Sequence, residues 1–366
     1  MTHAWIESGL NINAYGAALR RRFGGRVQRV SLDAGFTCPN VDGTLARGGC
    51  VFCDNRSFSP SRRGRLRAVL TQLESGIATV RKRYGNVRGF IAYFQPATNT
   101  YAPTDQLEEL FVAAARHPEV VGLAIGTRPD CVPDEVLELI DALAAERYVS
   151  LEFGMQSIHS KSLRWMNRAH EHEAMIDAMR RSCGRRFETC AHVILGIPGE
   201  THAEMMQTAA AVAHLEPDGI KLHNLYAVHG TPLGEQVLRG EVEMMEREDY
   251  IHTVVDFLER MPPQMIVERV SGEAPSEFLI APQWCLEKSS IRMDIDAEFL
   301  RRGSRQGTAY PPSGHSEQRA PELAHAAGPE LAPGYSGDAT PEAVRAKLCS
   351  TRVLPVLRLP KVQQRS

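Results

Sequence analysis

The chain is organised around the stretch Thr37-Cys-Pro-Asn-Val-Asp-Gly-Thr-Leu-Ala-Arg-Gly-Gly-Cys-Val-Phe-Cys-Asp54, which gathers three cysteines near the start of 366 residues. Cys50 and Cys53 are two residues apart and can face one metal centre, while Cys38 reaches it across a Gly-rich loop. A site with three protein ligands either takes a fourth from a distant residue or keeps one position open. We therefore interpret the stretch as a [4Fe-4S] site whose fourth iron binds a small molecule.

A structural zinc site is the alternative interpretation of the same cysteines. Its fourth ligand would come from one of the 13 histidines or from Cys131. The five cysteines outside the stretch have no ligand spacing, and most are expected to be small core residues: Cys131, Cys183, Cys190, Cys285 and Cys349.

The composition is that of an ordinary globular protein, with 43% hydrophobic residues, 23% charged residues and a formal net charge of -2. The net charge gives no argument for a nucleic-acid partner and none against a local basic patch. The first residues lack the basic start and apolar run of a secretory signal, and no stretch approaches about 18 uninterrupted apolar residues. We therefore expect a cytoplasmic protein without a membrane segment and with reduced cysteines.

Apolar strands alternate with amphipathic helices after a lead-in helix within residues 1–25. The predicted strands cover residues 26–33, 89–94, 120–126, 149–154, 187–196 and 219–226. The predicted helices cover residues 66–84, 104–115, 133–145, 160–181 and 201–215. This alternation indicates an α/β protein with a parallel sheet and right-handed crossovers, either doubly wound or curled into a barrel.

Polar residues follow nearly every predicted strand. In a parallel sheet the carboxyl ends of the strands lie along one rim, where ligands bind. The rim would therefore collect the cysteine loop, Gln95 with Thr98-Asn99-Thr100, Thr127-Arg128-Pro129-Asp130, Gln156, Gly196-Ile-Pro-Gly-Glu200, and His229-Gly230.

The pattern loosens beyond the sixth strand, and we divide the chain into four parts. The lead-in helix (1–25) and the core (26–229) precede an α+β extension (230–308), in which we expect a helix at 246–259, a strand at 265–270 and a short element at 278–284. The last part (309–366) is low in complexity and rich in proline. It cannot bury enough apolar surface to offset its ordering entropy, so we expect it to be mostly disordered, apart from a short helix at 341–348.

Several runs of the sequence resemble one family: Ser31-Leu-Asp-Ala-Gly-Phe-Thr-Cys-Pro-Asn40, Gly48-Gly-Cys-Val-Phe-Cys53, Tyr93-Phe-Gln95, Thr98-Asn-Thr-Tyr-Ala-Pro103 and Leu151-Glu-Phe-Gly-Met-Gln-Ser157. Together with the six βα units they resemble the radical S-adenosylmethionine (SAM) superfamily and, more narrowly, its YhcC group. That group is similar to the catalytic subunit of Elongator and to oxygen-independent coproporphyrinogen dehydrogenase. The resemblance extends from about residue 12 to about residue 308.

This resemblance implies a partial (β/α)6 TIM barrel, with a small α+β extension at its C-terminal side. It also implies one [4Fe-4S] cluster on Cys38, Cys50 and Cys53, with SAM chelating the open iron through its amino and carboxylate groups. A one-electron donor such as flavodoxin or ferredoxin would reduce the cluster, and SAM would then be cleaved to a 5′-deoxyadenosyl radical. One departure from the superfamily is the spacing, since 11 residues separate Cys38 from Cys50 where the usual motif is CxxxCxxC.

The resemblance also suggests contacts to SAM. It places the Gln156 amide near the ribose and the Arg168 guanidinium near the SAM carboxylate, with a surface helix arginine as the alternative for Arg168. Gln95 stands where the family has an acidic Gly-Gly-Glu signature. The remaining candidates also have structural alternatives, such as packing below the cluster, capping a turn or forming a plain turn: Phe52, Thr98, Asn99, Gly196 and Pro198.

Two further features could contact a substrate. Lys221 and His223 alternate with Leu222 on the sixth strand, so both could point into the lumen as catalytic candidates or form a satisfied polar pair in the core. The basic run Arg62-Arg63-Gly64-Arg65-Leu66-Arg67 could bind phosphates or could be a solvated helix start.

Three functions follow from these observations. The first is a radical SAM enzyme that abstracts a hydrogen atom from an unidentified substrate. The second is a radical SAM enzyme that modifies tRNA, suggested by the similarity to Elongator and by the basic run. The third is a zinc-stabilised nucleic-acid-binding or interaction protein, which would need no SAM.

Overall fold

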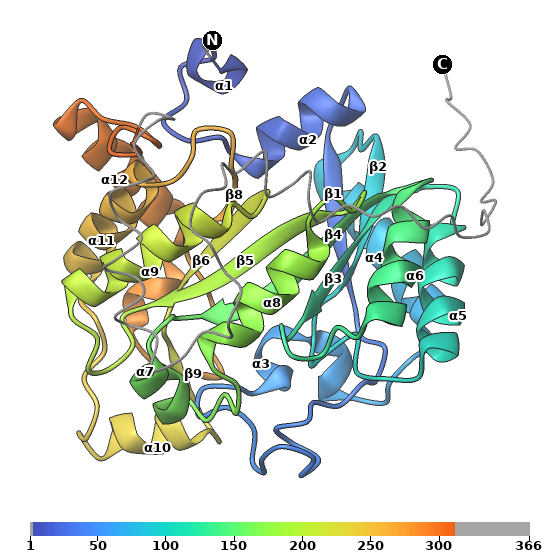
Figure 1. Cartoon of the computed structure of the whole chain (residues 1–366), viewed down its shortest axis with the longest axis horizontal. Helices are drawn as coiled ribbons and strands as arrows, with labels where there is room; N and C mark the ends of the chain where they lie inside the picture. The colour runs from blue at the N-terminus through green and yellow to red at the C-terminus, as the bar shows by residue number, and fades with distance from the viewer. Residues whose placement is uncertain (1–2, 312–366) are drawn as a thin grey trace, which may run out of the picture.

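The protein is described by a computed structural model that covers residues 3–311, apart from the side chains of residues 58, 60 and 61 (Figure 1). The tail that we expect to be disordered lies, from residue 312 onward, outside the described residues.

One parallel sheet of seven strands forms the centre of the molecule, and it curls so that one face is concave (Figure 1). Every neighbouring pair in it is parallel. Its strands are, in spatial order, β1 (Val27–Leu32), β2 (Gly89–Phe94), β3 (Val120–Thr127), β4 (Tyr148–Gln156), β5 (Glu188–Leu195), β6 (Gly219–Asn224) and β8 (Ile266–Arg269). The order follows the sequence, as right-handed crossovers require for a sheet that closes in one direction.

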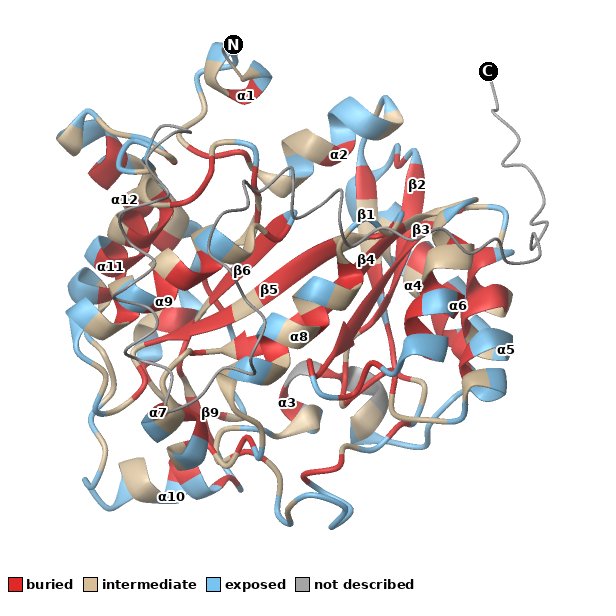
Figure 2. Cartoon of the chain, in the orientation of Figure 1, coloured by how far each residue is buried: buried red, intermediate tan, exposed pale blue. Residues whose placement is uncertain are grey.

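Helices cover the convex face of this sheet, with their red, buried sides turned toward the strands in Figure 2. The crossover helices are α4 (Val69–Tyr84), α5 (Thr104–Ala115), α6 (Asp134–Ala144), α7 (Ser160–Trp165), α8 (His172–Ser182) and α9 (His202–Leu215). Sequence explains their ends and faces: α9 begins with a capping box between Thr201 and Glu204, and the buried side of α6 carries apolar residues three or four positions apart.

The remaining elements lie at the ends of the chain and around the rim. The N-terminal helices are α1 (Ala4–Glu7) and α2 (Tyr15–Phe23), and α3 (Asn55–Phe58) and the 3-10 turn η1 (Pro60–Arg63) follow the cysteine loop. The later elements are α10 (Pro232–Leu238), α11 (Arg247–Glu259), η2 (Gln283–Leu286) and α12 (Lys288–Arg302), and a small antiparallel pair of β7 (Ala227–Val228) with β9 (Leu279–Ala281). No helix among residues 3–311 is long and apolar enough to cross a membrane.

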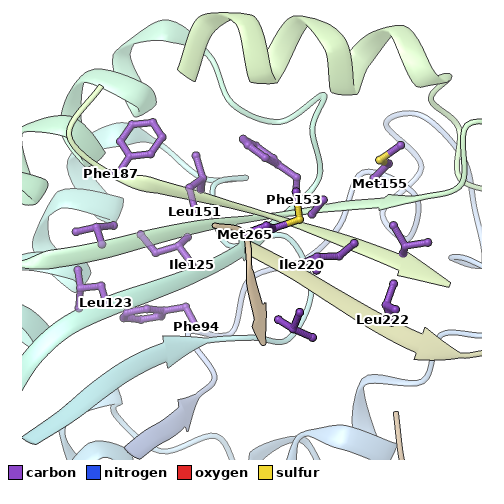
Figure 3. Close-up of a cluster of buried hydrophobic side chains, with 14 of the residues drawn as sticks. Phe94, Leu123, Ile125, Leu151, Phe153, Met155, Phe187, Ile220, Leu222 and Met265 are labelled. Carbon is purple, nitrogen blue, oxygen red and sulfur yellow. The ribbon is translucent and has the colours of Figure 1, made fainter. Parts of the chain in front are cut away.

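The main core lies between the sheet and the helices, where alternate strand residues interdigitate with the apolar helix faces (Figure 3). Leu151, Phe153 and Met155 of β4 belong to it, all of them almost fully buried. Because successive strand residues point to opposite faces, Glu152 and Gly154 lie on the inner, concave face. At the amino ends of the strands this inner face is covered by Leu19 of α2, which packs with Ile91, Tyr93 and other strand residues.

The predicted α/β fold with a parallel, curled sheet is confirmed, and all six predicted strands are present. The strand predicted in the C-terminal extension is β8. It pairs with β6 and so belongs to the main sheet as its seventh strand, which was not predicted. Helix α12 was not among the predicted elements, and the helical stretches predicted within 160–181 are the two helices α7 and α8.

Truncating a core residue of β4 tests this packing. Phe153→Ala should lower the free energy of unfolding by about 3–5 kcal/mol, because a fully buried ring is lost and a cavity remains. Leu300→Ala, on the 73% exposed Leu300 of α12, is the matched control and should change stability by less than about 0.5 kcal/mol. Urea denaturation measures both values, and equal losses would contradict the assigned core.

Candidate functional site

The cysteine loop leaves the carboxyl end of β1 and is docked on the loop that follows α7. Backbone Val51 N–H donates to Met166 O at 3.1 Å, and the Asn167 side-chain amide donates to Gly49 O at 2.7 Å. Gly48 and Gly49 have φ values of 82° and 76°, a region that residues with a side chain rarely adopt. The Gly-Gly pair therefore turns the chain back so that Cys50 follows it into the interior.

The three cysteines differ in exposure, and Cys38 and Cys50 are close enough to act electrostatically on Cys53. Cys50 is buried, Cys38 is half-buried and Cys53 is exposed as a residue. The Cys53 thiol nevertheless lies among enough protein atoms that burial, followed by the charges of Cys50 and Cys38, raises its pKa to about 12. The positive charge of Arg168 acts in the opposite direction on the same thiol. The three thiols therefore lie in one neighbourhood.

A single metal ion and an iron-sulfur cluster require different spacings of the three thiolates. Within residues 3–311, no group of three His, Cys, Asp or Glu side chains is arranged to hold a single metal ion. A zinc ion with 2.3 Å bonds would need its sulfurs roughly 3.8 Å apart. In a [4Fe-4S] cluster each cysteine binds a different iron, so the thiolates stand further apart around a larger centre.

Several buried polar atoms beside the cysteines have no hydrogen-bond partner within residues 3–311. They suit a bound group that is larger than one metal ion and has acceptor and donor atoms of its own. Asn40 Oδ1, Thr98 Oγ1, Arg128 Nη1 and Arg168 Nε are buried and have no hydrogen-bond partner among the described residues. Asn40 Nδ2 lies 3.6 Å from Cys50 Sγ, and Thr98 N–H donates to Thr37 O at 3.2 Å, so these groups border the cysteine loop. Unpaired buried polar groups are costly, which makes them good contacts for a bound group.

Arg168 contacts both the cysteine loop and strand β4 of the barrel. Its Nη1 lies 3.4 Å from Cys50 Sγ, and its Nη2 donates to Gly154 O of β4 at 2.8 Å. A Cβ on Gly154 would lie 2.9 Å from Gln156 Nε2 and 3.1 Å from Arg168 Nη2, so the missing side chain leaves room for both groups. Arg168 is buried, which makes the alternative of a surface helix arginine wrong.

Gln156 is brought to the same place by an irregular strand end. Its backbone φ is 68°, in the left-handed region that non-glycine residues seldom adopt. The register between β4 and β5 also shifts between Gly154 and Gln156. Such local strain is characteristic of binding sites, and here it positions the amide next to Arg168.

Two other predicted SAM contacts, Asn99 and Gln95, form hydrogen bonds within the protein. The Asn99 amide donates to Phe94 O, Pro96 O and Gly126 O at 3.1, 3.1 and 2.9 Å, so it holds the loop after β2 in place. Gln95 accepts a 3.2 Å hydrogen bond from Ser31. The roles of both residues toward SAM stay predictions.

Three further predicted contacts are Phe52, which belongs to the cysteine loop, and Gly196 and Pro198, which follow the end of β5. Phe52 packs against the small hydrophobic cluster around Leu163, Met166 and Ile197. Gly196 has a φ of 79°, and a Cβ there would lie 3.0 Å from Met245 Cβ. The glycine thus makes room for Met245, while Pro198 is half-buried in the turn that follows.

The basic run after the cysteine loop is partly used inside the protein. Arg62 forms an ion pair with the buried Asp33 at 2.6 Å, and Arg63 pairs with Glu277 at 3.2 Å. Arg65 and Arg67 are exposed. The Arg62 pair is partly buried and the Arg63 pair lies at the surface, and together they leave less unpaired basic charge than the sequence indicates.

A buried network of charges lies on the inner face of the sheet below the cysteine loop. It joins Arg29 of β1, Glu152 of β4, Lys221 of β6 and Glu268 of β8. Arg29 Nη2 lies 3.0 Å from Glu152 Oε1 and 2.5 Å from Glu268 Oε2. Lys221 Nζ contacts Glu152 Oε2, lies 3.5 Å from Glu268 Oε2 and donates to Tyr93 Oη at 3.1 Å. The pairing balances two positive and two negative charges.

The position of Lys221 and His223 was predicted, but their surroundings were not. Lys221 is fully buried in the network, while His223 is half-buried beside His192, with ring centroids 5.6 Å apart. The sequence carried a signal for one missed partner, because Glu152 is a charge among the mostly apolar residues of β4. Single charges at inward positions of buried strands are costly unless they pair with one another.

Glu152 is the centre of the network and is fully buried. Burial favours its neutral form, but the charges of Lys221 and Arg29 outweigh this effect and hold its pKa well below 4.5. His192 Nε2 also lies 3.0 Å from Glu152 Oε2. The carboxylate is therefore ionised in the folded protein at neutral pH.

Glu152→Gln should destabilise the protein by about 3–5 kcal/mol at pH 7, because it leaves Lys221 and Arg29 without a full counter-charge in the interior. Asp177→Asn, which breaks surface ion pairs with Arg180 and Arg181, is the control and should cost less than about 1 kcal/mol. Chemical denaturation measures both changes. A loss for Glu152→Gln no larger than the control would show that the network is not coupled to folding.

The same substitution predicts a change in pH dependence. Because folding lowers the pKa of Glu152, its contribution is fully present above the unfolded value near 4.5 and is lost as the pH falls through the lower folded value. The free energy of unfolding of the wild type should therefore decrease more steeply below about pH 4.5 than that of Glu152→Gln. Parallel curves for the two proteins over this acid range would contradict the assignment.

Known protein families match most of the described chain. A model of the Radical SAM superfamily matches residues 45–212, and a model of the Radical_SAM C-terminal domain matches residues 217–301. YtqA of Bacillus subtilis (strain 168) is 38% identical over 292 residues, covering 80% of this chain and 90% of that protein. YhcC of Escherichia coli (strain K12) is 36% identical over 301 residues, covering 81% of this chain and 95% of that protein.

A solved structure shows the same fold at low sequence identity. The archaeal Methanocaldococcus infernus Elp3, with an N-terminal deletion, has a TM-score of 0.56 and 17% identity, covering 76% of this chain and 64% of that one. The two matching domains, the relatives and the curled parallel sheet agree with one another. The chain therefore belongs to the radical SAM superfamily and, within it, to the group that contains YhcC and YtqA.

Proposed function

We propose that this protein binds one [4Fe-4S] cluster through Cys38, Cys50 and Cys53, and cleaves SAM reductively to abstract a hydrogen atom from a substrate. The observation that carries the proposal is Arg168, a buried guanidinium 3.4 Å from Cys50 Sγ that still has an unpaired Nε. Cys38, Cys50 and Cys53 would hold the cluster, which when bound would supply the electron for reductive cleavage of SAM. Family membership supports the enzyme class.

The residues of this chain have three tasks in such a reaction. The Gly48-Gly49 turn presents Cys50 and Cys53 from one short segment, and Cys38 enters from the start of the loop. Arg168 offers a permanently charged fork for the SAM carboxylate, with Gln156 beside it for a ribose hydroxyl. The inner face of the sheet then receives the substrate below SAM, away from bulk water.

The two alternative functions receive less support. A zinc-stabilised binding protein would not account for the match of this chain to the two radical SAM family models. A tRNA substrate was suggested partly by the basic run, in which Arg62 and Arg63 are engaged by Asp33 and Glu277. Modification of tRNA stays a hypothesis about the substrate, and it is compatible with the proposed chemistry.

Loss of one ligand should remove the cluster and the reaction together. After anaerobic reconstitution, Cys50→Ala should retain little iron and sulfide and release no 5′-deoxyadenosine from SAM upon reduction, because a thiolate ligand is missing. Cys183→Ala, at a half-buried cysteine outside the loop, is the control and should keep both. Iron analysis and chromatography of the nucleoside give the two readouts. Stoichiometric zinc in the wild type, with no nucleoside released, would refute the proposal.

Replacing the guanidinium of Arg168 should weaken the binding of SAM more than the binding of the cluster. Arg168→Lys keeps a positive charge but loses the bidentate geometry, so the Kd for SAM should rise at least about tenfold while iron content is retained. Arg164→Lys, at an exposed arginine of α7, is the matched control and should leave the Kd unchanged. Equilibrium binding of radiolabelled SAM to the reconstituted proteins measures the change. An unaltered Kd in Arg168→Lys would remove Arg168 from the SAM site.

A further inference from the structure

One positive charge on the inner face has no counter-charge. Arg29 and Lys221 are balanced by Glu152 and Glu268, as described above. Arg269, the last residue of β8, is half-buried and pairs with Lys221 in the sheet, but its guanidinium has no hydrogen-bond or ion-pair partner within the described part of the chain. Three cationic side chains thus share this region with two carboxylates, which leaves an excess of one positive charge.

An irregularity between β6 and β8 explains how two successive charged residues reach one face. Ile220 pairs with Val267, but Lys221 pairs with Arg269, so Glu268 is an extra residue in the register. A bulge of this kind disturbs the alternation of side chains and redirects them. Glu268 reaches the network, and the charge of Arg269 acts on His192 and His223, which belong to the inner faces of β5 and β6.

His223 provides a second unsatisfied polar group beside Arg269. Its Nε2 is buried and has no hydrogen-bond partner among residues 3–311. Burial, and then the positive charge of Arg269, hold the pKa of His223 well below 6.5, so the ring is neutral at pH 7. A neutral imidazole can donate one hydrogen bond without adding another charge. A Cβ on Gly272 would lie only 3.1 Å from His223 Nδ1, so the loop after β8 closes over the other side of the ring.

Arg269 acts electrostatically on a tyrosine on which Cys53 of the cysteine loop also acts. Tyr226 follows β6, and burial raises its pKa to about 12. The charges of Arg269 and Cys53 both act on this tyrosine, in opposite directions. Tyr226 is therefore close to the cysteine site on one side and to Arg269 on the other, and a molecule held by Arg269 would lie within reach of a group bound at the cysteines.

We propose that Arg269 and His223 form an oxyanion-binding site on the inner face of the sheet, which holds a carboxylate or phosphate group of the substrate. This inference rests on the proposed function for its view of the inner face as the substrate compartment. A guanidinium fork matches either oxyanion, and a neutral imidazole N–H adds a directed hydrogen bond. One monoanion also cancels the excess charge. The buried network of Arg29, Glu152, Lys221 and Glu268 holds the site in position. Because the charges of this network already balance, it leaves no positive charge for a second anion.

Histidine NMR of the full-length protein tests the site without turnover. The protein is labelled with 13C,15N-histidine and titrated at fixed pH and ionic strength with inorganic phosphate, acetate or chloride, before and after cluster reconstitution. His223→Gln and His192→Gln identify the two relevant signals among those of the 13 histidines. Phosphate or acetate should shift the His223 signal saturably, whereas chloride should not. The stronger of the two oxyanions identifies the chemical class.

Two arginine variants test whether the shift of the His223 signal by oxyanions depends on Arg269. Arg269→Gln should weaken oxyanion binding at least about tenfold, because a charged hydrogen-bond donor is lost. Arg20→Gln, at an exposed arginine of α2, should leave the titration unchanged. An equal affinity in wild type and Arg269→Gln, or no shift with either oxyanion, would overturn the site.

A titration with SAM distinguishes this inference from the proposed function, because SAM carries a carboxylate of its own. A His223 shift with SAM, but with neither phosphate nor acetate, would assign Arg269 to the SAM site and overturn the inference. If the protein cleaves SAM but no oxyanion binds, the inference fails and the proposed function stands. If oxyanions bind through Arg269 in a reconstituted protein that does not cleave SAM, the site stands and the proposed function fails.

Discussion

The ion pairs of Glu152 are the constraint on which the inner face of the barrel depends. This fully buried carboxylate of β4 contacts Lys221 of β6 and lies 3.0 Å from both Arg29 of β1 and His192 of β5. A buried charge of this kind is tolerated only when its partners surround it, so the strands must curl toward one another to supply them. The curvature that gathers the cysteine loop and the rim residues is thus coupled to a balanced set of charges.

Much of the fold could be predicted because apolar periodicity is strong in the first two thirds of the chain. The boundaries of β2 and α5 coincide with the predicted ones, and their residues alternate or repeat clearly. Helix α12 was overlooked although Ile291, Ile295 and Phe299 recur every four residues, because charged residues surround them. Strand β8 was predicted, but its place in the main sheet depends on a long-range pairing that local pattern does not contain.

The site was predictable to the extent that its chemistry is concentrated in short motifs. The cysteines and Arg168 could be named from sequence, and the structure brings them together across 118 positions of the chain. Arg29 and Glu268 could not be assigned, because each is a single charge whose partner lies on a distant strand, and Arg269 has no ion-pair partner among the described residues that could have indicated its position. The bulge at Glu268 adds to this difficulty, since it breaks the alternation from which side-chain direction is inferred.

The most direct test of the central claim is the electron paramagnetic resonance spectrum of the reconstituted, reduced protein with and without SAM. A cluster held by three cysteines has one iron open to SAM, so addition of SAM should change the g-values of the reduced signal. A spectrum that is identical with and without SAM would mean that the fourth iron is closed or that the centre is of another kind. Either result would contradict the account of the cysteine loop and of Arg168.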